Sequence, residues 1–254
     1  MGKRKEYTGE ALVAASRWQE AFAGFPPAQQ RAVIVRVDEL VAENPEYCDE
    51  GNYGYLCNLF TGLAVYEWHV AQGVPAGEAY RLTARPSWAA VEKTAEMYRR
   101  LFKVPGMFRL FGVLAPRLLG GGYGWRCQFH PSTKARVQGE CLQCICADIL
   151  GKYGCREVGC MFCHADEINF GSIPGVTFTR EHTLCGDGQP CDFLFTRDRG
   201  RRRAGRGVAR CGRELRRARV GARGWRCIGR GCACCGGGAR RAWMCGHRRH
   251  PGGR

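Results

Sequence analysis

Residues able to do chemistry are concentrated in one stretch of the chain, between residues 141 and 192. The thiols, imidazoles and carboxylates that we single out there are Cys141, Cys144, Cys146, Cys155, Cys160, Cys163, His164, Asp166, His182, Cys185, Asp187, Cys191 and Asp192. Buried cysteine is common in protein cores, so several of these thiols are expected only to pack. The density of nucleophilic and ligating groups nevertheless makes this stretch the candidate site.

The spacing of four cysteines in this stretch allows a metal site. Cys141-Leu-Gln-Cys144 and Cys160-Met-Phe-Cys163 are two CxxC pairs separated by fifteen residues, within the range of structural zinc sites. Neither pair carries the Gly or Pro that usually shapes the turn of a zinc knuckle. A divalent metal such as zinc on these thiolates would give either a non-catalytic, cysteine-rich metal- or ligand-binding domain or a metal-activated water for hydrolysis.

Several short motifs follow one another in a fixed order across the same stretch. They are Cys144-Ile-Cys-Ala-Asp148, Cys163-His-Ala-Asp166, Pro174-Gly-Val-Thr-Phe-Thr-Arg180, Thr183-Leu184 and Cys191-Asp-Phe193. In order and spacing they resemble the L-2-amino-thiazoline-4-carboxylic acid hydrolase family, and a weaker likeness extends over roughly residues 52–197. Cys146 and Glu181-His182 depart from the family pattern, and these departures concern the substrate more than the fold.

The resemblance implies hydrolysis of a small molecule at a cyclic amidine-like carbon held between nitrogen and sulfur. A thiolate or water must reach this carbon, an acid must protonate the departing ring atom, and a cation must meet the substrate carboxylate. Cys163 is the expected nucleophile and Asp166, one helical turn away, the expected acid/base, with Cys144 in the same catalytic set. The residues expected to bind the substrate are Arg180, as partner of the carboxylate, and Thr183, His182, Cys191 and Asp192.

Each central residue also has a purely structural interpretation. Cys163 could be a small buried hydrophobic side chain, Asp166 an acid on a helix surface, and Arg180 a charge at a strand edge. Only the geometry of the folded chain distinguishes these interpretations from catalysis.

The elements that must position these residues follow from periodicity. Apolar residues repeat at helical spacing over residues 32–42, 53–72 and 107–119, and Ser87 is expected to cap a further helix that Pro105 ends. Strands are expected at 125–129, 135–139, 176–184 and 191–196, with two short helices over 144–170 that part near Gly154. This order predicts an α+β fold, in which N-terminal helices pack on one face of a small antiparallel sheet.

Positive charge is concentrated at the C-terminal end of the chain. Residues 199–254 hold 18 Arg, no Lys and one acid, Glu214, so their formal net charge is +17. Because the whole chain has a formal net charge of +16, residues 1–198 carry −1. We therefore expect a hydrolase-like domain over 1–198 with no specific nucleic-acid partner, followed by a disordered Arg/Gly/Cys-rich tail. Because codons made only of G and C favour Arg, Gly and Ala and exclude Lys, we interpret the tail as out-of-frame sequence.

Cysteine content and hydropathy bear on the cellular compartment. The chain has 17 Cys, and residues 1–7 are basic without the apolar core of a signal peptide. We therefore expect reduced thiols in the cytoplasm. The most apolar stretch, residues 108–119, is short and is interrupted by two Arg and a Pro, so no membrane partner is expected. The sequence leaves the oligomeric state open.

Overall fold

The computed structural model describes residues 6–118 and 123–198. The chain divides into two units, residues 1–219 and 220–254, and every described residue belongs to the first. The predicted tail over residues 199–254 and the last residue of the predicted helix 107–119 lie outside the described residues. The boundary placed after residue 198 therefore stays a prediction.

The described residues form eight α-helices, two short 3-10 helices and four strands. The helices are α1 (Gly9–Ala14), α2 (Gln19–Phe22), α3 (Pro27–Glu43), α4 (Tyr53–Ala71), α5 (Ala76–Leu101), α6 (Met107–Leu118), α7 (Ile145–Lys152) and α8 (Cys160–Phe170), with η1 (Pro45–Tyr47) and η2 (Arg156–Gly159). The strands are β1 (Arg126–Phe129), β2 (Arg136–Gln143), β3 (Val176–Thr179) and β4 (Cys191–Arg197). None of the described helices is long and apolar enough to cross a membrane.

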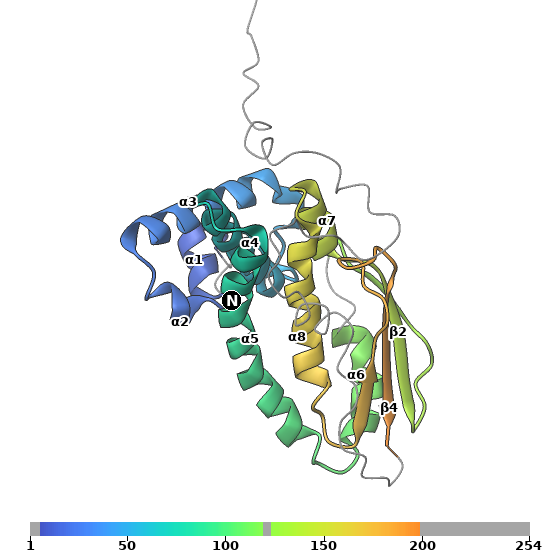
Figure 1. The fold of residues 1–254 in the computed structure, drawn as a ribbon. Coiled ribbons are helices and arrows are strands. Elements are labelled where there is room, and N and C mark those ends of the chain that lie inside the picture. The colour runs from blue at the N-terminus through green and yellow to red at the C-terminus, as the bar shows by residue number, and fades with distance from the viewer. Residues whose placement is uncertain (1–5, 119–122, 199–254) are drawn as a thin grey trace, which may run out of the picture. The chain divides into compact units, whose positions relative to one another are not determined.

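The helix α4 is the centre of the helical part. Its residues from Leu56 to Tyr66 are almost all buried, as expected for a helix that is apolar around its whole circumference. It packs against α1, α3 and α5, while α5 lies beside α8 (Figure 1). The fully buried Trp18, in the turn after α1, donates from its indole to the carbonyl of Thr83 in α5 (2.9 Å) and so ties this turn to the helical core.

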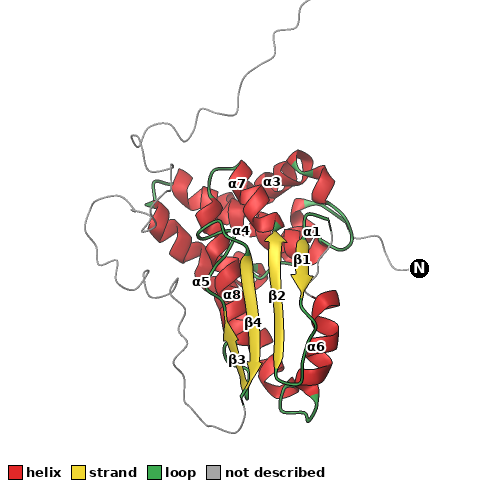
Figure 2. Cartoon of the chain, turned by 90° about the vertical axis from the view of Figure 1, so that its right-hand side faces the viewer, coloured by secondary structure: helices red, strands yellow, loops and turns green. Residues whose placement is uncertain are grey.

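The four strands form one antiparallel sheet with the order β1-β2-β4-β3. Alternation along the strands directs Val137 of β2 and Phe195 of β4 to the inner face, where neither side chain is exposed. Phe108 of α6 and Phe170 of α8 pack against this face. The described helices lie on one side of the sheet (Figures 1 and 2). The predicted α+β class is therefore confirmed.

The structure changes which helices cover the sheet and where one of them begins. The helices that pack against the inner face of the sheet are α6, α8 and the end of α5, whereas α4 packs among other helices. The prediction that Ser87 caps a helix is wrong, because α5 begins at Ala76 and runs through Pro86, which leaves Ser87 buried inside it. Pro86 removes one helical N–H, but packing of α5 against α4 and α8 keeps the helix continuous.

Two strands differ in length from their predicted ranges. Strand β2 continues to Gln143, because it is paired on both sides, with β1 and with β4. Strand β3 ends at Thr179 instead of residue 184, since the backbone N–H groups of Glu181 and His182 donate to the Asp192 carboxylate and not to a neighbouring strand. The two helices parted near Gly154 are present as α7 and α8, with η2 between them.

Candidate active site

A pocket of about 380 Å³ lies among α4, the start of α7, α8 and one end of the sheet. Its thiol lining consists of Cys141, Cys144, Cys146, Cys163, Cys185 and Cys191. Its charged residues are Arg17, Asp166 and Arg180, and its aromatic walls are Tyr55, Trp125, Phe162 and Phe193. The volume falls within the usual range for small-molecule sites, roughly 300–1,000 Å³.

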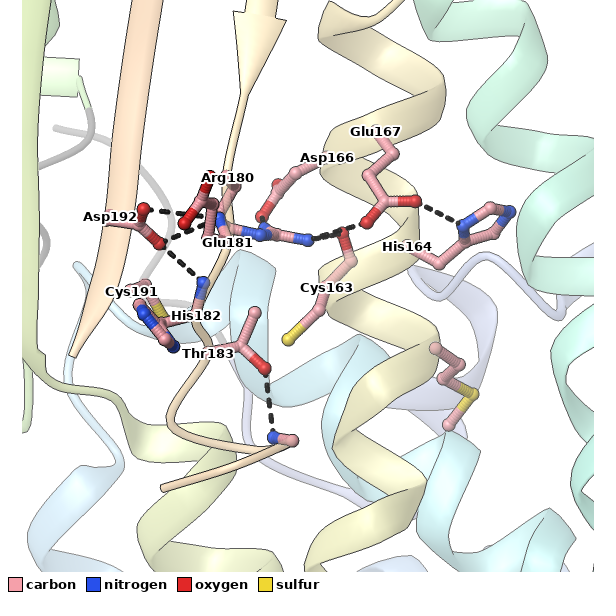
Figure 3. Close-up of polar contacts among 12 residues, drawn as sticks. Cys163, His164, Asp166, Glu167, Arg180, Glu181, His182, Thr183, Cys191 and Asp192 are labelled. Atoms are coloured by element: carbon pink, nitrogen blue, oxygen red, sulfur yellow. Dashed lines mark hydrogen bonds and ion pairs between the residues drawn. The ribbon is translucent and has the colours of Figure 1, made fainter. Parts of the chain in front are cut away.

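Asp166 is held in this pocket by Arg180. The Arg180 guanidinium donates to Asp166 Oδ2 at 3.0 Å, to the Cys163 carbonyl oxygen at 2.8 Å and to Glu167 Oε1 at 3.2 Å (Figure 3). It also lies 5.7 Å from the centroid of the Phe193 ring, and only 3 % of its side chain is accessible. Arg180 therefore positions Asp166, and little of its surface remains for a substrate carboxylate.

Burial and two nearby arginines act in opposite directions on the pKa of Asp166. About 37 % of the side chain is accessible, and Asp166 lines the pocket. Burial raises the pKa of Asp166 above its ordinary value, and the nearby Arg180 and Arg17 offset this only in part. A carboxyl group with a raised pKa is a better candidate for general acid/base catalysis than an ordinary Asp.

Cys144 is the thiol whose anion is best stabilised. It precedes α7 directly, with an extended backbone. Hydrogen bonds from the Cys146 and Cys185 thiols hold the pKa of Cys144 well below its usual value, and the backbone N–H groups of Ala147 and Cys146 act in the same direction. A cysteine at a helix N-terminus is a common setting for a reactive thiolate.

Two other thiols of the pocket, Cys185 and Cys191, have raised pKa values. The hydrogen bonds of Cys185 to Cys144 and Cys163 raise the pKa of Cys185, so it remains a proton donor. Burial raises the pKa of Cys191 to about 12. Cys163 lies on α8 with its sulfur directed toward the segment that follows β3 (Figure 3). Of the expected catalytic residues, Cys144, Cys163 and Asp166 are thus brought together in one pocket.

Three of the residues expected to bind substrate do not line the pocket. Asp192 accepts hydrogen bonds from the backbone N–H groups of Glu181 and His182 (3.0 and 2.6 Å), and Thr183 Oγ1 accepts one from Gly186 (2.9 Å) (Figure 3). His182 is half-exposed and pairs with Asp187 (2.6 Å). These contacts shape the loop between β3 and β4, whereas Arg180 and Cys191 of the expected set do line the pocket.

The four thiols of the zinc alternative do not form one cluster. Cys141 Sγ lies 2.8 Å from Cys127 Sγ on the adjacent strand and donates to the Gln143 carbonyl. Cys160 Sγ faces the carbonyl of Cys185 at 3.9 Å and is absent from the pocket lining. Within residues 6–118 and 123–198, no group of three or more His, Cys, Asp or Glu side chains is arranged to hold a metal ion. The zinc alternative thus has no preformed site in this part of the chain.

The pocket also contains residues that sequence reasoning missed. Arg17 lies before the first long helix, and Tyr55 and Asn58 belong to a helix whose periodicity indicated only packing. Trp125 and Phe193 were assigned to strands without a role in the site. Phe193 belongs to the Cys191-Asp-Phe193 motif, whereas no motif surrounds the other four; for Arg17 the one available signal was a cation directly before Trp18.

The fold and the pocket together define an α+β protein with a thiol-rich pocket that contains an Arg-paired acid. The model of the L-2-amino-thiazoline-4-carboxylic acid hydrolase family matches residues 64–195, which is more than half of the 254-residue chain. The chain therefore belongs to this family, which supports a hydrolase role. No curated protein and no solved structure matches the chain.

Proposed function

We propose that the chain is a hydrolase that opens a sulfur-containing cyclic amidine, such as 2-amino-thiazoline-4-carboxylate, at the ring carbon–nitrogen bond. One observation carries the proposal: a stabilised Cys144 thiolate and an Asp166 carboxyl with a raised pKa line the same pocket in a member of this family. A nucleophile and a proton donor are the two groups that this ring opening requires.

The first half of the reaction is a thiolate attack. Cys144 Sγ forms a bond to the ring carbon between sulfur and nitrogen, and protonated Asp166 gives its proton to the ring nitrogen. The bond from the carbon to this nitrogen then breaks, and a second proton passes to the nitrogen from the exocyclic amino group. The ring nitrogen leaves as a primary amine, and the exocyclic group becomes an imine. Cys144 takes the nucleophilic role expected of Cys163, because hydrogen bonds to its sulfur lower the pKa of Cys144.

The second half releases the product. Water adds to the same carbon and gives one proton to the imine nitrogen; its oxygen becomes the carbonyl, and the bond to Cys144 Sγ breaks. Cys144 leaves as a thiolate, and the Asp166 carboxylate takes up the proton that is released. One water is consumed, both residues return to their starting states, and the product is a carbamoyl-cysteine with the carbamoyl group on sulfur. Arg180 keeps Asp166 oriented throughout.

A ring-opening assay on the full-length chain tests the proposal. Mass spectrometry should detect carbamoyl-cysteine from 2-amino-thiazoline-4-carboxylate, and Cys144→Ala should lower the rate by roughly 10³-fold or more because the covalent route is lost. Asp166→Asn should lower it by about 10²- to 10⁴-fold. Cys155→Ala, a buried thiol outside the pocket lining, is the control and should keep the rate. No turnover by the wild-type chain, or full turnover by Cys144→Ala, rules the proposal out.

Covalent trapping separates the two candidate thiols. Intact-mass measurement after rapid acid quench should show a substrate adduct on the wild-type chain and on Cys163→Ala, and none on Cys144→Ala. An adduct that survives in Cys144→Ala and disappears in Cys163→Ala would return the nucleophilic role to Cys163.

A further inference from the structure

The pocket holds a second arginine, Arg17, whose charge has no close partner. Its guanidinium makes no hydrogen bond or ion pair with any residue of the described ranges, although Arg17 lines the pocket. The opposite charge that acts most strongly on it is Asp166, which already accepts a hydrogen bond from Arg180. Burial lowers the pKa of Arg17, but a guanidinium remains cationic in proteins. A buried cation without a partner is costly, so this position favours an anion.

The chain fixes Arg17 in place from both sides. Its backbone N–H donates to Asn58 Oδ1 of α4 at 2.9 Å. The next residue, Trp18, is fully buried, and its indole donates to the Thr83 carbonyl. Its backbone N–H meets the Ser16 hydroxyl at 3.2 Å. The turn that presents Arg17 is therefore anchored independently of the guanidinium.

Arg17 and Arg180 differ in how many guanidinium N–H donors remain available to a ligand. The side chain of Arg180 is almost inaccessible, and its N–H groups donate to Asp166, Glu167 and the Cys163 carbonyl. Arg17 is partly accessible, and its guanidinium retains all five N–H donors in a geometry that suits a carboxylate.

We infer that Arg17 binds the carboxylate of the substrate, so that the pocket selects small anionic molecules over their neutral analogues. This assignment rests on the proposed function for the identity of the ring, but the anion preference follows from the pocket alone. Arg17 lies outside the family match, which begins at residue 64. Asp166 and Cys144 then lie on the reacting side of the ligand and Arg17 at its anionic end.

Binding of two matched probes tests the inference without turnover. The probes are 2-aminothiazole-4-carboxylate, a flat aromatic analogue, and the corresponding neutral carboxamide, measured by calorimetry on the full-length chain. The wild-type chain should prefer the carboxylate, and Arg17→Met should lose roughly 10- to 100-fold in affinity for it while its affinity for the carboxamide stays the same. Arg17→Lys should keep part of the preference, and Arg31→Met, an exposed arginine on α3, should keep all of it.

The outcomes are distinct from those of the ring-opening assay. No carboxylate preference in the wild-type chain, or an equal loss for both probes in Arg17→Met, overturns the assignment. If Arg17→Met does not fold, Arg17→Gln is compared in the same way. A chain that prefers the carboxylate through Arg17 but opens no thiazoline would disprove the proposed function and leave this inference standing.

Discussion

Arg180 illustrates how one residue can have a different role from the one that its charge suggests. Sequence reasoning assigned it to the substrate carboxylate, yet it forms an ion pair with Asp166 and Glu167 inside the protein. Removal of one partner from a buried ion pair leaves the other charges without compensation.

Arg180→Met should lower the free energy of unfolding by about 3–5 kcal/mol, because Asp166 and Glu167 lose their shared cation. Without Arg180 the pKa of Asp166 rises further. A carboxyl with a raised folded-state pKa contributes stability below its unfolded pKa, roughly 3.9, and this contribution is lost as pH rises through the folded pKa. Urea unfolding at pH 4.5 and pH 7 should thus show the larger loss at pH 7. Equal losses would mean that Asp166 is not the affected group.

Cys144 should react with iodoacetamide at lower pH than an ordinary cysteine, for which half-ionisation lies at roughly 8.5. Hydrogen bonds from Cys146 and Cys185 lower its pKa, so its thiolate is already present at a pH where most thiols are protonated. Cys48 is the matched control, because burial and then Glu46 and Asp49 raise its pKa to about 11. Peptide mapping across a pH series gives both profiles. Coincident profiles would contradict the assignment of the thiolate.

His182 should titrate above its ordinary value in an NMR experiment. Its hydrogen bond with Asp187 raises the pKa of His182, and Asp187→Asn should return it toward the ordinary value. The stabilising contribution of the charged pair is present below the unfolded pKa of His, about 6.5, and is lost as pH rises through the folded pKa. An unchanged titration in Asp187→Asn would show that the pair does not form in solution.

At the scale of elements, close approach between α4, α8 and the turn after α1 positions the pocket. A Cβ at Gly62 of α4 would meet Trp18 Cη2 at 2.8 Å and Met161 Cε of α8 at 2.9 Å. These contacts leave no room for a methyl group. Trp18 follows Arg17 in the chain, and Met161 precedes Cys163 on α8. A displacement of Trp18 or Met161 is therefore expected to move these pocket residues.

Gly62→Ala should therefore destabilise the fold by about 1–3 kcal/mol, as overpacking does in well-packed cores. Gly54→Ala is the control within the same helix, since a Cβ there has no neighbour within 4 Å. It should be neutral or stabilise by roughly 0.4–1 kcal/mol through the unfolded state. Thermal unfolding of the two variants against the wild type provides the comparison. A neutral Gly62→Ala would show that the helices can separate without cost.

At the scale of the whole molecule, charge separates the chain into two parts of different composition. Residues 199–254 hold 18 Arg, 14 Gly and one acid, while the preceding residues carry −1. A segment of this composition has little apolar area to bury. The residues that form the pocket and the family match all precede it.

Removal of residues 199–254 should leave ring opening and the melting temperature unchanged, since the pocket residues all lie before the deleted segment. The full-length chain should bind DNA or RNA without sequence preference and with a steep salt dependence, and the shortened chain should not. Activity assays, melting curves and binding at two salt concentrations check this. Loss of activity in the shortened chain would show that the segment contributes to function and would contradict its interpretation as out-of-frame sequence.

The sequence by itself determined the α+β class and the order of the elements from α3 to β4, because periodicity and turn residues are local signals; it did not predict the short helices α1 and α2. It also determined the family and the stretch in which Cys144, Cys163 and Asp166 lie. It misplaced the start of α5, since Ser87 has the local features of a cap but is buried by long-range packing.

Only the tertiary structure decided which charges meet. Arg180 is an internal partner of Asp166, and Arg17 is the cation that remains available in the pocket. Pairing and burial depend on contacts between residues far apart in the chain, which leave no periodic or local signal in the sequence. The same holds for the thiols: spacing suggested a four-cysteine metal site, whereas strand register places Cys141 opposite Cys127 and leaves Cys144 at the N-terminus of α7, where its anion is stabilised.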